Sequence, residues 1–588
     1  MPSEFEHLPP EIELPDKTLP KSDMIMGIDL GTTFSCVAIV QDDFPKVIPS
    51  RKGLRTTPSI VAADDKGRLL VGEDARKQLL INPTNTIYGA KRFIGRHFYS
   101  DEVAVLSRYF SYQVQPLGEM QIGAVIGDRT FSLQQVSAMI LNDLRKNVCE
   151  YLKENVDQAV VSVPAYYTEN QREAVRQAGK IAGIDVVRII NEPTAASLAY
   201  GLNRQLDTRI LVYDLGGGTF DASVLELFED VFKVLATGGD TFLGGVDFDE
   251  RVVEYILSEY ERQEGQILQC DSVITQRLKD AAERAKIELS TKNVTTIELP
   301  YITISGGKFK DFRCDLDREQ IEELTRDLVE RTIEVCIEVI DAADMTPEDI
   351  DSVILVGGQT RMPLVIEQTS GFFGKAPTKG VHPDEVVACG AALMADSLGK
   401  ERTVRLIDVL PMSIGGRQPN GGFKVLFPSN STLPAEAEIG VATTQDGQDA
   451  IEVFIYQGES PRAAENEFLG AFVITGFPKA KAGQTKLLVN LALSQESILD
   501  VTARSLSTGM PMHVQMVART PRPAEDVGLQ PLTPAAGEPA PPAQPTAAVA
   551  AGAPVTAPTD PVIGAQDTPP PPRKRFSGLR SFIRRITD

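Results

Sequence analysis

The sequence predicts an internally duplicated α/β domain, a small all-β domain and a disordered tail, and three observations carry this prediction. From residue 24 to about residue 400, short β-rich runs such as IMGIDLG and RILVYDLGGG alternate with segments of helical period, which is typical of α/β layering. From about residue 408 to residue 518, short strands with turn signals follow one another with almost no helical signal. Residues 521–572 contain 15 of the chain's 39 prolines, a composition that does not form a core.

Length and charge exclude several classes of protein. The 588 residues exceed what one hydrophobic core supports, so we expect several domains. The 59 basic and 81 acidic side chains give a net charge of −22, which argues against nucleic acid as the main partner because an acidic surface repels phosphate backbones. Residues 1–23 are acidic and broken by proline, with no signal-peptide pattern. We therefore expect a disordered acidic arm there and a cytoplasmic protein.

The six cysteines and four histidines are scattered along the chain. The two closest cysteines, Cys314 and Cys336, are 22 residues apart, and no CxxC pair occurs. A disulfide framework or a zinc site requires tighter clustering. We expect reduced, mostly buried thiols.

Periodicity places the main elements along the chain. Apolar residues at helical spacing predict helices over 133–154 and 317–343. After the β-domain, residues 519–572 are expected to form a Pro/Ala-rich linker. Residues 573–588 regain a helical period, with Phe576, Leu579, Phe582, Ile583 and Ile586 on one face and Arg580, Arg584 and Arg585 largely on the other. This basic amphipathic helix fits a solvated tail, an anionic membrane surface or a partner's groove, and the sequence leaves these open.

Two segments share one design for handling phosphate. In residues 28–33 and again in residues 213–221, a strand ends in an aspartate that a Gly/Thr turn follows. Glycines let the backbone approach phosphate oxygens, and N–H groups and threonine hydroxyls then donate to them. The aspartates can hold a hydrated magnesium ion. One such turn is usually a plain hairpin, but two copies about 185 residues apart predict a duplicated fold with a nucleotide between the halves.

A third glycine turn, at residues 357–363, follows the buried strand VILV. It can place backbone against a nucleoside, with the Arg361 guanidinium stacked on the base. The chain contains neither the P-loop motif GxxxxGK[ST] nor the dinucleotide fingerprint GxGxxG. The three turns together favour ATP in a site of another design.

Longer motifs carry a specific resemblance. They are IDLGTTFSCVA, YGAKRFIGR, VSVPAYYTENQREAVRQAGKIAGIDVVRIINEPTAASLAYG, VYDLGGGTFDASVLE, GGDTFLGGVDFD, RLKDAAERAKIELS, ILVGGQTRMP and HPDEVVACGAAL. From about Met24 to Ala518 the chain resembles the 70-kDa heat-shock chaperones of the DnaK type. NEPTAASLAYG and GGDTFLGGVDFD distinguish that family from actins and sugar kinases of the same fold. The resemblance implies an actin-like ATPase domain over residues 24–400, with ATP and Mg²⁺ between two lobes.

The resemblance also assigns roles to residues in the matching motifs. It implies that Asp29, Glu192 and Asp214 surround the hydrated magnesium, and that Lys91 reaches the γ-phosphate and the attacking water with help from Asp221. By composition alone Lys91 would be read as a solvated surface lysine. The implied phosphate contacts are Gly31, Thr32, Thr33, Gly216, Gly217, Gly218 and Thr219. The implied nucleoside contacts are Glu283, Lys286, Ile287, Ser290, Gly357, Gly358, Arg361 and Asp384. Without the resemblance, residues 283, 286 and 290 would be read as a polar helix face.

The same resemblance assigns coupling residues and partners. Residues 401–411 match the linker that carries the nucleotide signal, and Pro164 and Arg172 match the switch that reads it. Arg405 interrupts the apolar run of the linker, so we expect weakened coupling. Arg188, Asn191 and Asp408 match positions used by J-domain co-chaperones. A J-domain protein, a nucleotide exchange factor and unfolded or extended polypeptides are therefore the expected partners.

The substrate side departs from the family pattern. Residues 412–518 match the β-sandwich that binds peptide, with Ile451 at its central pocket, Val453 beside it and Thr444 at an arch position. The loop of residues 415–422 lacks the expected apolar arch residues, which should weaken peptide capture because apolar pockets gain affinity by desolvation. The helical lid of the family is replaced by the Pro/Ala-rich linker, so bound peptide should leave quickly.

Three functions remain as hypotheses. The first is a lidless ATP-dependent chaperone. The second is a nucleotide-controlled adaptor that docks one partner, or a membrane, through its basic tail. The third, a sugar kinase of the same fold, ranks lowest because the sequence carries no sugar-pocket signal and adds a β-domain that such kinases lack.

Overall fold

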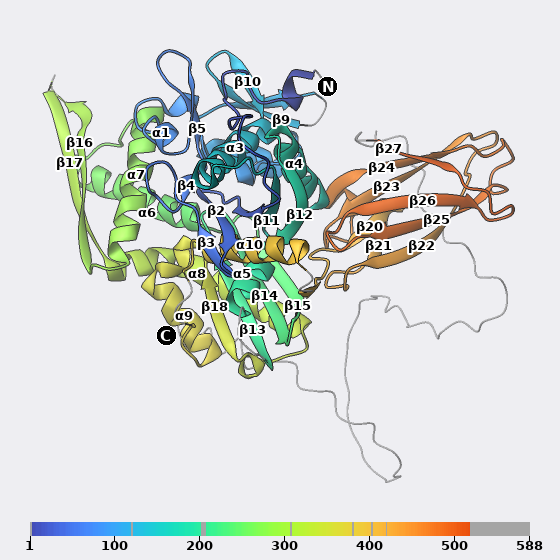
Figure 1. The fold of residues 1–588 in the computed structure, drawn as a ribbon. Coiled ribbons are helices and arrows are strands. Elements are labelled where there is room, and N and C mark those ends of the chain that lie inside the picture. Colours follow the sequence, from blue (N-terminus) through green and yellow to red (C-terminus); the bar gives the residue numbers. More distant parts are fainter. Residues whose placement is uncertain are drawn as a thin grey trace, which may run out of the picture. The chain divides into compact units, whose positions relative to one another are not determined.

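The computed structural model describes residues 3–118, 121–201, 207–305, 308–378, 382–400, 404–418 and 420–517 (Figure 1). The predicted linker over 519–572 and the basic helix over 573–588 lie outside these residues. The described chain holds an α/β part, in which mixed sheets are covered by helices, and a separate all-β part.

The first half of the α/β part is built on a sheet of strand order β12-β11-β1-β2-β3, with β4 also paired to β2. Strand β1 runs parallel to β11 and antiparallel to β2, so Asp29 lies at its carboxyl end beside Ser162. The strands are β1 (Ile25–Asp29), β2 (Phe34–Gln41), β3 (Phe44–Val47), β4 (Thr57–Pro58), β11 (Gln158–Val163) and β12 (Asp185–Asn191).

The second half repeats this arrangement. Its sheet has the order β18-β13-β14-β15-β19, and β13 runs antiparallel to β14 and parallel to β18, as β1 does with β2 and β11. Asp214 in β13 therefore corresponds to Asp29 in β1, which is the duplication that the two phosphate turns predicted. The strands are β13 (Asp207–Leu215), β14 (Phe220–Phe228), β15 (Val231–Asp240), β18 (Ser352–Val356) and β19 (Arg405–Ile407).

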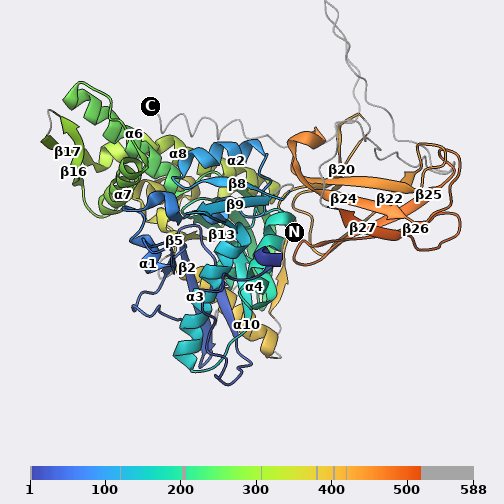
Figure 2. The same ribbon diagram turned by 90° about the horizontal axis from the view of Figure 1, so that it is seen from above.

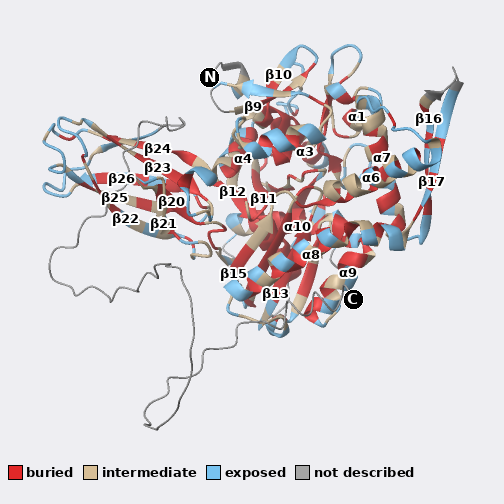
Figure 3. Cartoon of the chain, turned by 180° about the vertical axis from the view of Figure 1, so that it is seen from behind, coloured by how far each residue is buried: buried red, intermediate tan, exposed pale blue. Residues whose placement is uncertain are grey.

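Helices cover these sheets and bury their apolar faces (Figure 3). Helix α3 (Leu133–Leu152) begins at Ser132 and α8 (Arg318–Ala342) at Asp317, each through a reciprocal capping box, so both lie where the periodicity placed them. Helix α10 (Val386–Gly399) packs against α5 and β1 and so contacts elements of both halves. The other covering helices are α4 (Glu169–Ile181), α5 (Glu192–Gly201) and α9 (Pro363–Phe373).

Smaller elements extend each half. Figure 2 shows α6, α7 and the β16–β17 hairpin grouped together, and α7 packs against both α6 and β16. In the second half these elements are α6 (Gly245–Glu264), α7 (Ser272–Leu289), β16 (Val294–Ser305) and β17 (Lys308–Asp317). In the first half they are β5 (Val61–Ala63), β6 (Leu69–Val71), α1 (Glu73–Arg76), β7 (Thr86–Ile87), α2 (Asp101–Leu106), β8 (Val114–Leu117), β9 (Gln121–Ile126) and β10 (Arg129–Ser132).

The all-β part is a sandwich of two sheets, with orders β21-β20-β23-β24-β27 and β22-β25-β26. In β25 every second side chain is buried, from Leu487 to Leu493, as expected for a strand with one face on a core. The strands are β20 (Ile414–Arg417), β21 (Phe423–Phe427), β22 (Ala435–Ala442), β23 (Ala450–Gln457), β24 (Glu467–Thr475), β25 (Lys486–Leu493), β26 (Leu499–Ser505) and β27 (His513–Val517).

The N-terminal arm is ordered from residue 3, which corrects the expectation of disorder over residues 1–23 for the part described. Its apolar side chains Leu8, Ile12 and Leu19 pack against the core of the first half. Its carbonyl groups accept hydrogen bonds from helix α3, at His7 from Gln135 and at Glu13 from Asn142. Composition suggested disorder because the arm buries its few apolar groups only against another part of the chain.

The described residues show the state of the cysteines and whether any helix could span a membrane. All six cysteines are free thiols, four of them buried and Cys270 exposed. Across the described ranges, no helix is both long enough and apolar enough to span a bilayer.

Ile12→Ala is expected to lower the free energy of unfolding by roughly 1–2 kcal/mol, because Ile12 contributes to the packed side of the arm. Leu14→Ala is the matched control, since Leu14 is 42% exposed. Urea unfolding of both variants checks this, and equal effects would contradict the packing described for the arm.

Candidate functional site

A cavity of about 760 Å³ opens between the two halves. Its lining combines the turn after β1, the turn after β13, the turn after β18 and one face of α7. These are the three glycine turns and the helix that the sequence singled out. The cavity size is in the range of small-molecule and cofactor sites.

The two phosphate turns face each other closely across this cavity. A Cβ placed on Gly217 would lie 2.1 Å from the Oγ1 of Thr33, so no larger residue fits there without movement of the turns. Gly31 is equally restricted, because its Cβ would lie 2.0 Å from the carbonyl oxygen of Phe34. The geometry leaves backbone N–H groups and the hydroxyls of Thr32, Thr33 and Thr219 at the cavity.

A buried ion pair lies on the floor of the cavity. The Nζ of Lys91 is 2.6 Å from Oε1 of Glu192, and the two side chains are only 7% and 9% exposed. The hydroxyl of Tyr167 donates to the carbonyl oxygen of Lys91 at 2.7 Å, which fixes the backbone that carries this lysine. Glu192 is placed by its position as the first residue of α5, directly after β12.

Three aspartates surround this pair. Asp29 accepts a hydrogen bond from the Ser162 hydroxyl at 3.0 Å, and Asp221 accepts one from the backbone N–H of Tyr166 at 3.1 Å. Burial, reinforced by the charge of Glu192, raises the pKa of Asp29 to about 7 and that of Asp221 to about 7. The same causes raise the pKa of Asp214 well above its ordinary value. Burial alone would lower the pKa of Lys91, but the interactions with Glu192, Tyr167 and Asp29 together outweigh it and the pKa is raised.

This cluster has an excess of negative charge. Four carboxyl groups lie around one ammonium group, and the raised pKa values express the cost of ionising them together. A divalent cation beside Asp29, Glu192 and Asp214 would relieve that cost. Among the described residues no three carboxylate, histidine or cysteine side chains are arranged to ligate a metal directly. The carboxylate oxygens suit a hard divalent cation such as Mg²⁺, which commonly keeps several water ligands when it is bound.

Most of the residues that the resemblance assigned to the nucleoside lie together on the cavity lining. Glu283, Lys286 and Ile287 of α7 line it together with Gly357 and Gly358, Arg361 and Asp384. The Arg361 guanidinium is held 2.6 Å from Asp384. Gly357 has φ +83° and its Cβ would lie 2.3 Å from the Leu215 carbonyl oxygen, so this turn also requires glycine.

Three predicted residues do not line the cavity. Gly218 lies behind its turn, where its carbonyl oxygen accepts from Arg92 at 3.1 Å. Ser290 ends helix α7 and donates to the Lys286 carbonyl oxygen at 3.2 Å. Asp221 is buried beside the lining rather than in it.

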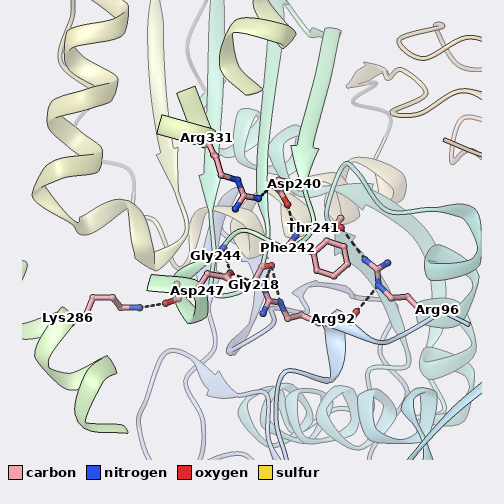
Figure 4. Close-up of polar contacts among 11 residues, drawn as sticks. Arg92, Arg96, Gly218, Asp240, Thr241, Phe242, Gly244, Asp247, Lys286 and Arg331 are labelled. Atoms are coloured by element: carbon pink, nitrogen blue, oxygen red, sulfur yellow. Dashed lines mark hydrogen bonds and ion pairs between the residues drawn. The ribbon is translucent and has the colours of Figure 1, made fainter. Parts of the chain in front are cut away.

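Two residues of the site were missed from the sequence. Asp249 pairs with Lys286 at 2.8 Å, and Arg92 links the Gly218 carbonyl to Asp247 (Figure 4). Asp249 ends the quoted motif GGDTFLGGVDFD, and Arg92 lies in YGAKRFIGR directly after Lys91. The motifs were the only sign of these two residues in the sequence, and the fold shows which partners Asp249 and Arg92 contact.

Three of the five predicted coupling residues form one chain of hydrogen bonds that reaches the linker. Arg172 donates to the Oδ1 of Asn191 at 2.7 Å, and the Nδ2 of Asn191 donates to Asp408 at 2.8 Å. Pro164 precedes α4 in the same region, and its carbonyl oxygen accepts from the Tyr167 N–H. Arg188 lies at the edge, 3.4 Å from Gln495.

The linker pairs with the second half as strand β19, parallel to β15. Residues 401–403 of the predicted linker lie outside the described residues. The Arg405 side chain is exposed, so this residue does not prevent the strand from pairing. Weakened coupling through Arg405 stays a prediction.

The predicted peptide-binding residues do not gather at one surface. Ile451 and Val453 are 2% and 3% exposed and belong to the core of the sandwich, whereas Thr444 is exposed on a loop. The loop between β20 and β21 closes on itself, since the Gln418 N–H donates to the Gly422 carbonyl oxygen at 2.8 Å. In this arrangement the two apolar side chains face their own core.

A family comparison identifies the relatives of this architecture. The family model described as Hsp70 protein matches residues 25–530. The chain belongs to the Hsp70 family. The match begins at β1 and extends beyond β27, so it covers both the α/β part and the sandwich. Hsp70 proteins are nucleotide-dependent chaperones with ATPase activity, and the cavity between the halves lies where the resemblance places their nucleotide.

In this Hsp70 protein, Asp221→Asn is expected to stabilise the fold at high pH. The raised pKa means that the folded state holds the proton up to about pH 7, so wild-type stability falls as pH rises from about 4 through about 7. The asparagine variant lacks this loss and should exceed wild type by up to about 4 kcal/mol at pH 8, with little difference near pH 4. Urea unfolding without nucleotide tests this, and parallel pH profiles would contradict it.

Proposed function

We propose that this protein is an ATP-dependent chaperone of the DnaK type, which hydrolyses ATP and binds exposed apolar segments of unfolded polypeptides. The observation that carries the proposal is the pair of phosphate turns facing each other over the buried Lys91–Glu192 pair. A site that only stored a nucleotide would not need a buried ammonium group among ionisable carboxylates. Phosphoryl transfer depends on such charges, placed where the transition state develops charge.

Residues in different parts of the cavity have different proposed roles. Backbone N–H groups of residues 31–33, Gly217 and Thr219 hold the phosphates, and α7 with Arg361 holds the nucleoside. Mg²⁺, when bound, neutralises phosphate charge, and Asp29, Glu192 and Asp214 hold its water ligands. The Lys91 ammonium group contacts the γ-phosphate and orients the attacking water. Asp221, whose Oδ1 accepts from the Tyr166 N–H, is buried beside the lining and assists from there.

The linker contacts provide a route from the nucleotide to the sandwich. Asn191 donates to Asp408 and accepts from Arg172, and Asn191 directly precedes Glu192 in the chain. A J-domain protein acting at Arg188, Asn191 and Asp408, and a nucleotide exchange factor, complete the proposed cycle. The proposed location is the cytoplasm.

Lys91→Ala is expected to abolish hydrolysis while ATP affinity changes by less than about tenfold, because the ammonium group acts mainly on the transferred phosphate. Lys77→Ala is the matched control, since Lys77 also lines the cavity but is 68% exposed and paired with Asp74. Single-turnover hydrolysis and calorimetric ATP binding check both variants. Turnover retained in Lys91→Ala would contradict the assigned role.

The burial of Ile451 and Val453 favours a second candidate, a nucleotide-controlled adaptor whose sandwich binds one fixed partner. The two functions differ in their response to unstructured apolar peptide. A chaperone is expected to hydrolyse ATP several-fold faster with such a peptide and a J-domain, and to release the peptide when ATP binds. ATP turnover that is indifferent to both additions would favour the adaptor.

A further inference from the structure

The loop of residues 240–247 joins β15 to α6 and connects the two halves. The N–H groups of Gly245 and Val246 donate to the carbonyl oxygens of Gly216 and Gly217, both at 2.9 Å, so the loop supports the second phosphate turn from behind. Although the loop belongs to the second half, the Phe242 side chain packs against the hydrophobic core of the first half. The loop is thus a segment of the second half whose Phe242 side chain packs against the core of the first half.

Two arginines on the segment that carries Lys91 hold this loop (Figure 4). Arg92 donates to the Gly218 carbonyl oxygen at 3.1 Å and to Asp247 at 2.9 Å. Arg96 donates to the Thr241 hydroxyl at 3.2 Å, and its guanidinium carbon lies 4.9 Å from the centre of the Phe242 ring. The Nε of Arg96 also donates to the Arg92 carbonyl oxygen at 2.9 Å, which joins the two contacts into one unit.

Internal hydrogen bonds hold the loop in shape, so a displacement at one of these contacts moves the rest of the loop. Asp240 accepts from the Phe242 N–H and Asp247 from the Gly244 N–H, each at 2.8 Å. Arg331 of α8 pairs with Asp240 from the other side. A displacement of Phe242 would therefore move the backbone that supports Gly216 and Gly217.

Burial strengthens the contact of Arg96 with the ring. Burial lowers the pKa of Arg96, and the charges of Glu467, Tyr167 and Glu102 partly offset this. A cation over an aromatic face gains more when both are withdrawn from water. Arg96 and Phe242 are both half-buried, so their contact gains more than a fully exposed pair would.

We propose that Arg96 and Phe242 form a latch between the halves, and that the latch positions Lys91 against the second phosphate turn. Arg96 and Phe242 are positioning residues, since neither lines the cavity. The inference rests on the proposed function, because it assigns the latch to ATP hydrolysis. Through the latch, the first-half segment that carries Lys91 is held against the second phosphate turn, which belongs to the second half.

Kinetics of the full chain test the latch. Phe242→Leu and Arg96→Gln are each expected to slow single-turnover hydrolysis by about tenfold, with ATP affinity changed by less than about threefold. Phe242→Tyr keeps the ring and should retain near wild-type rates. Arg129→Gln is the matched control, because Arg129 lies 4.7 Å from the Phe131 ring outside the cavity. Wild-type rates in both latch variants, or equal losses in the control, would overturn the proposal.

A second measurement does not depend on hydrolysis. The chain has no tryptophan, so Phe242→Trp introduces a single fluorescent reporter that keeps a ring opposite Arg96. Acrylamide is expected to quench it weakly, and at least about twofold more strongly when Arg96→Gln is added. Equal quenching would overturn the latch. If wild type hydrolyses no ATP, the proposed function fails and the quenching comparison alone decides whether the latch exists.

Discussion

Carboxylates buried around a single ammonium group are the constraint on which the rest of this structure depends. The pair of Lys91 and Glu192, 2.6 Å apart, satisfies one negative charge, and Asp29, Asp214 and Asp221 are left to share a poorly solvated space. Such an arrangement is costly for the protein alone, because burial penalises every unpaired charge. Positive charge would relieve this cost, so the cluster suits a cation and, under the proposed function, the phosphates that the cation accompanies.

The duplicated fold is what brings these charges together. Each half presents a strand that ends in an aspartate and a turn of small residues, and the halves meet so closely that Gly217 and Thr33 nearly touch. Closing two such halves requires contacts from outside the cavity. Arg96 and Phe242 supply such contacts, and together with Arg92 at the cavity they tie the Lys91 segment to the loop that supports the second turn. Under the proposed function, catalysis and closure would therefore share one short segment of chain, residues 91–96.

Local patterns predicted the elements well, because capping residues such as Ser132 and Asp317 act on their own helices. The aspartate and glycine positions of the site followed from motifs and from family resemblance. The sequence did not predict partners that meet only after folding, such as Asp249 with Lys286 or Phe242 with Arg96. It also suggested disorder in the N-terminal arm, since the packing of Leu8 and Ile12 depends on a surface formed by distant residues. Ile451 and Val453 illustrate the same limit, because a strand pattern does not say whether an apolar side chain faces a core or a ligand.

The central claim is that the buried carboxylates make this cleft a site for a nucleotide together with a divalent cation. Calorimetric titration of the full chain with ATP, once with Mg²⁺ and once with a chelator, tests it most directly. The account predicts saturable binding of one ATP per chain with Mg²⁺ and affinity at least about tenfold lower without it, since each phosphate would then face unscreened carboxylates. Equal affinity under both conditions, or no binding with Mg²⁺, would contradict the account.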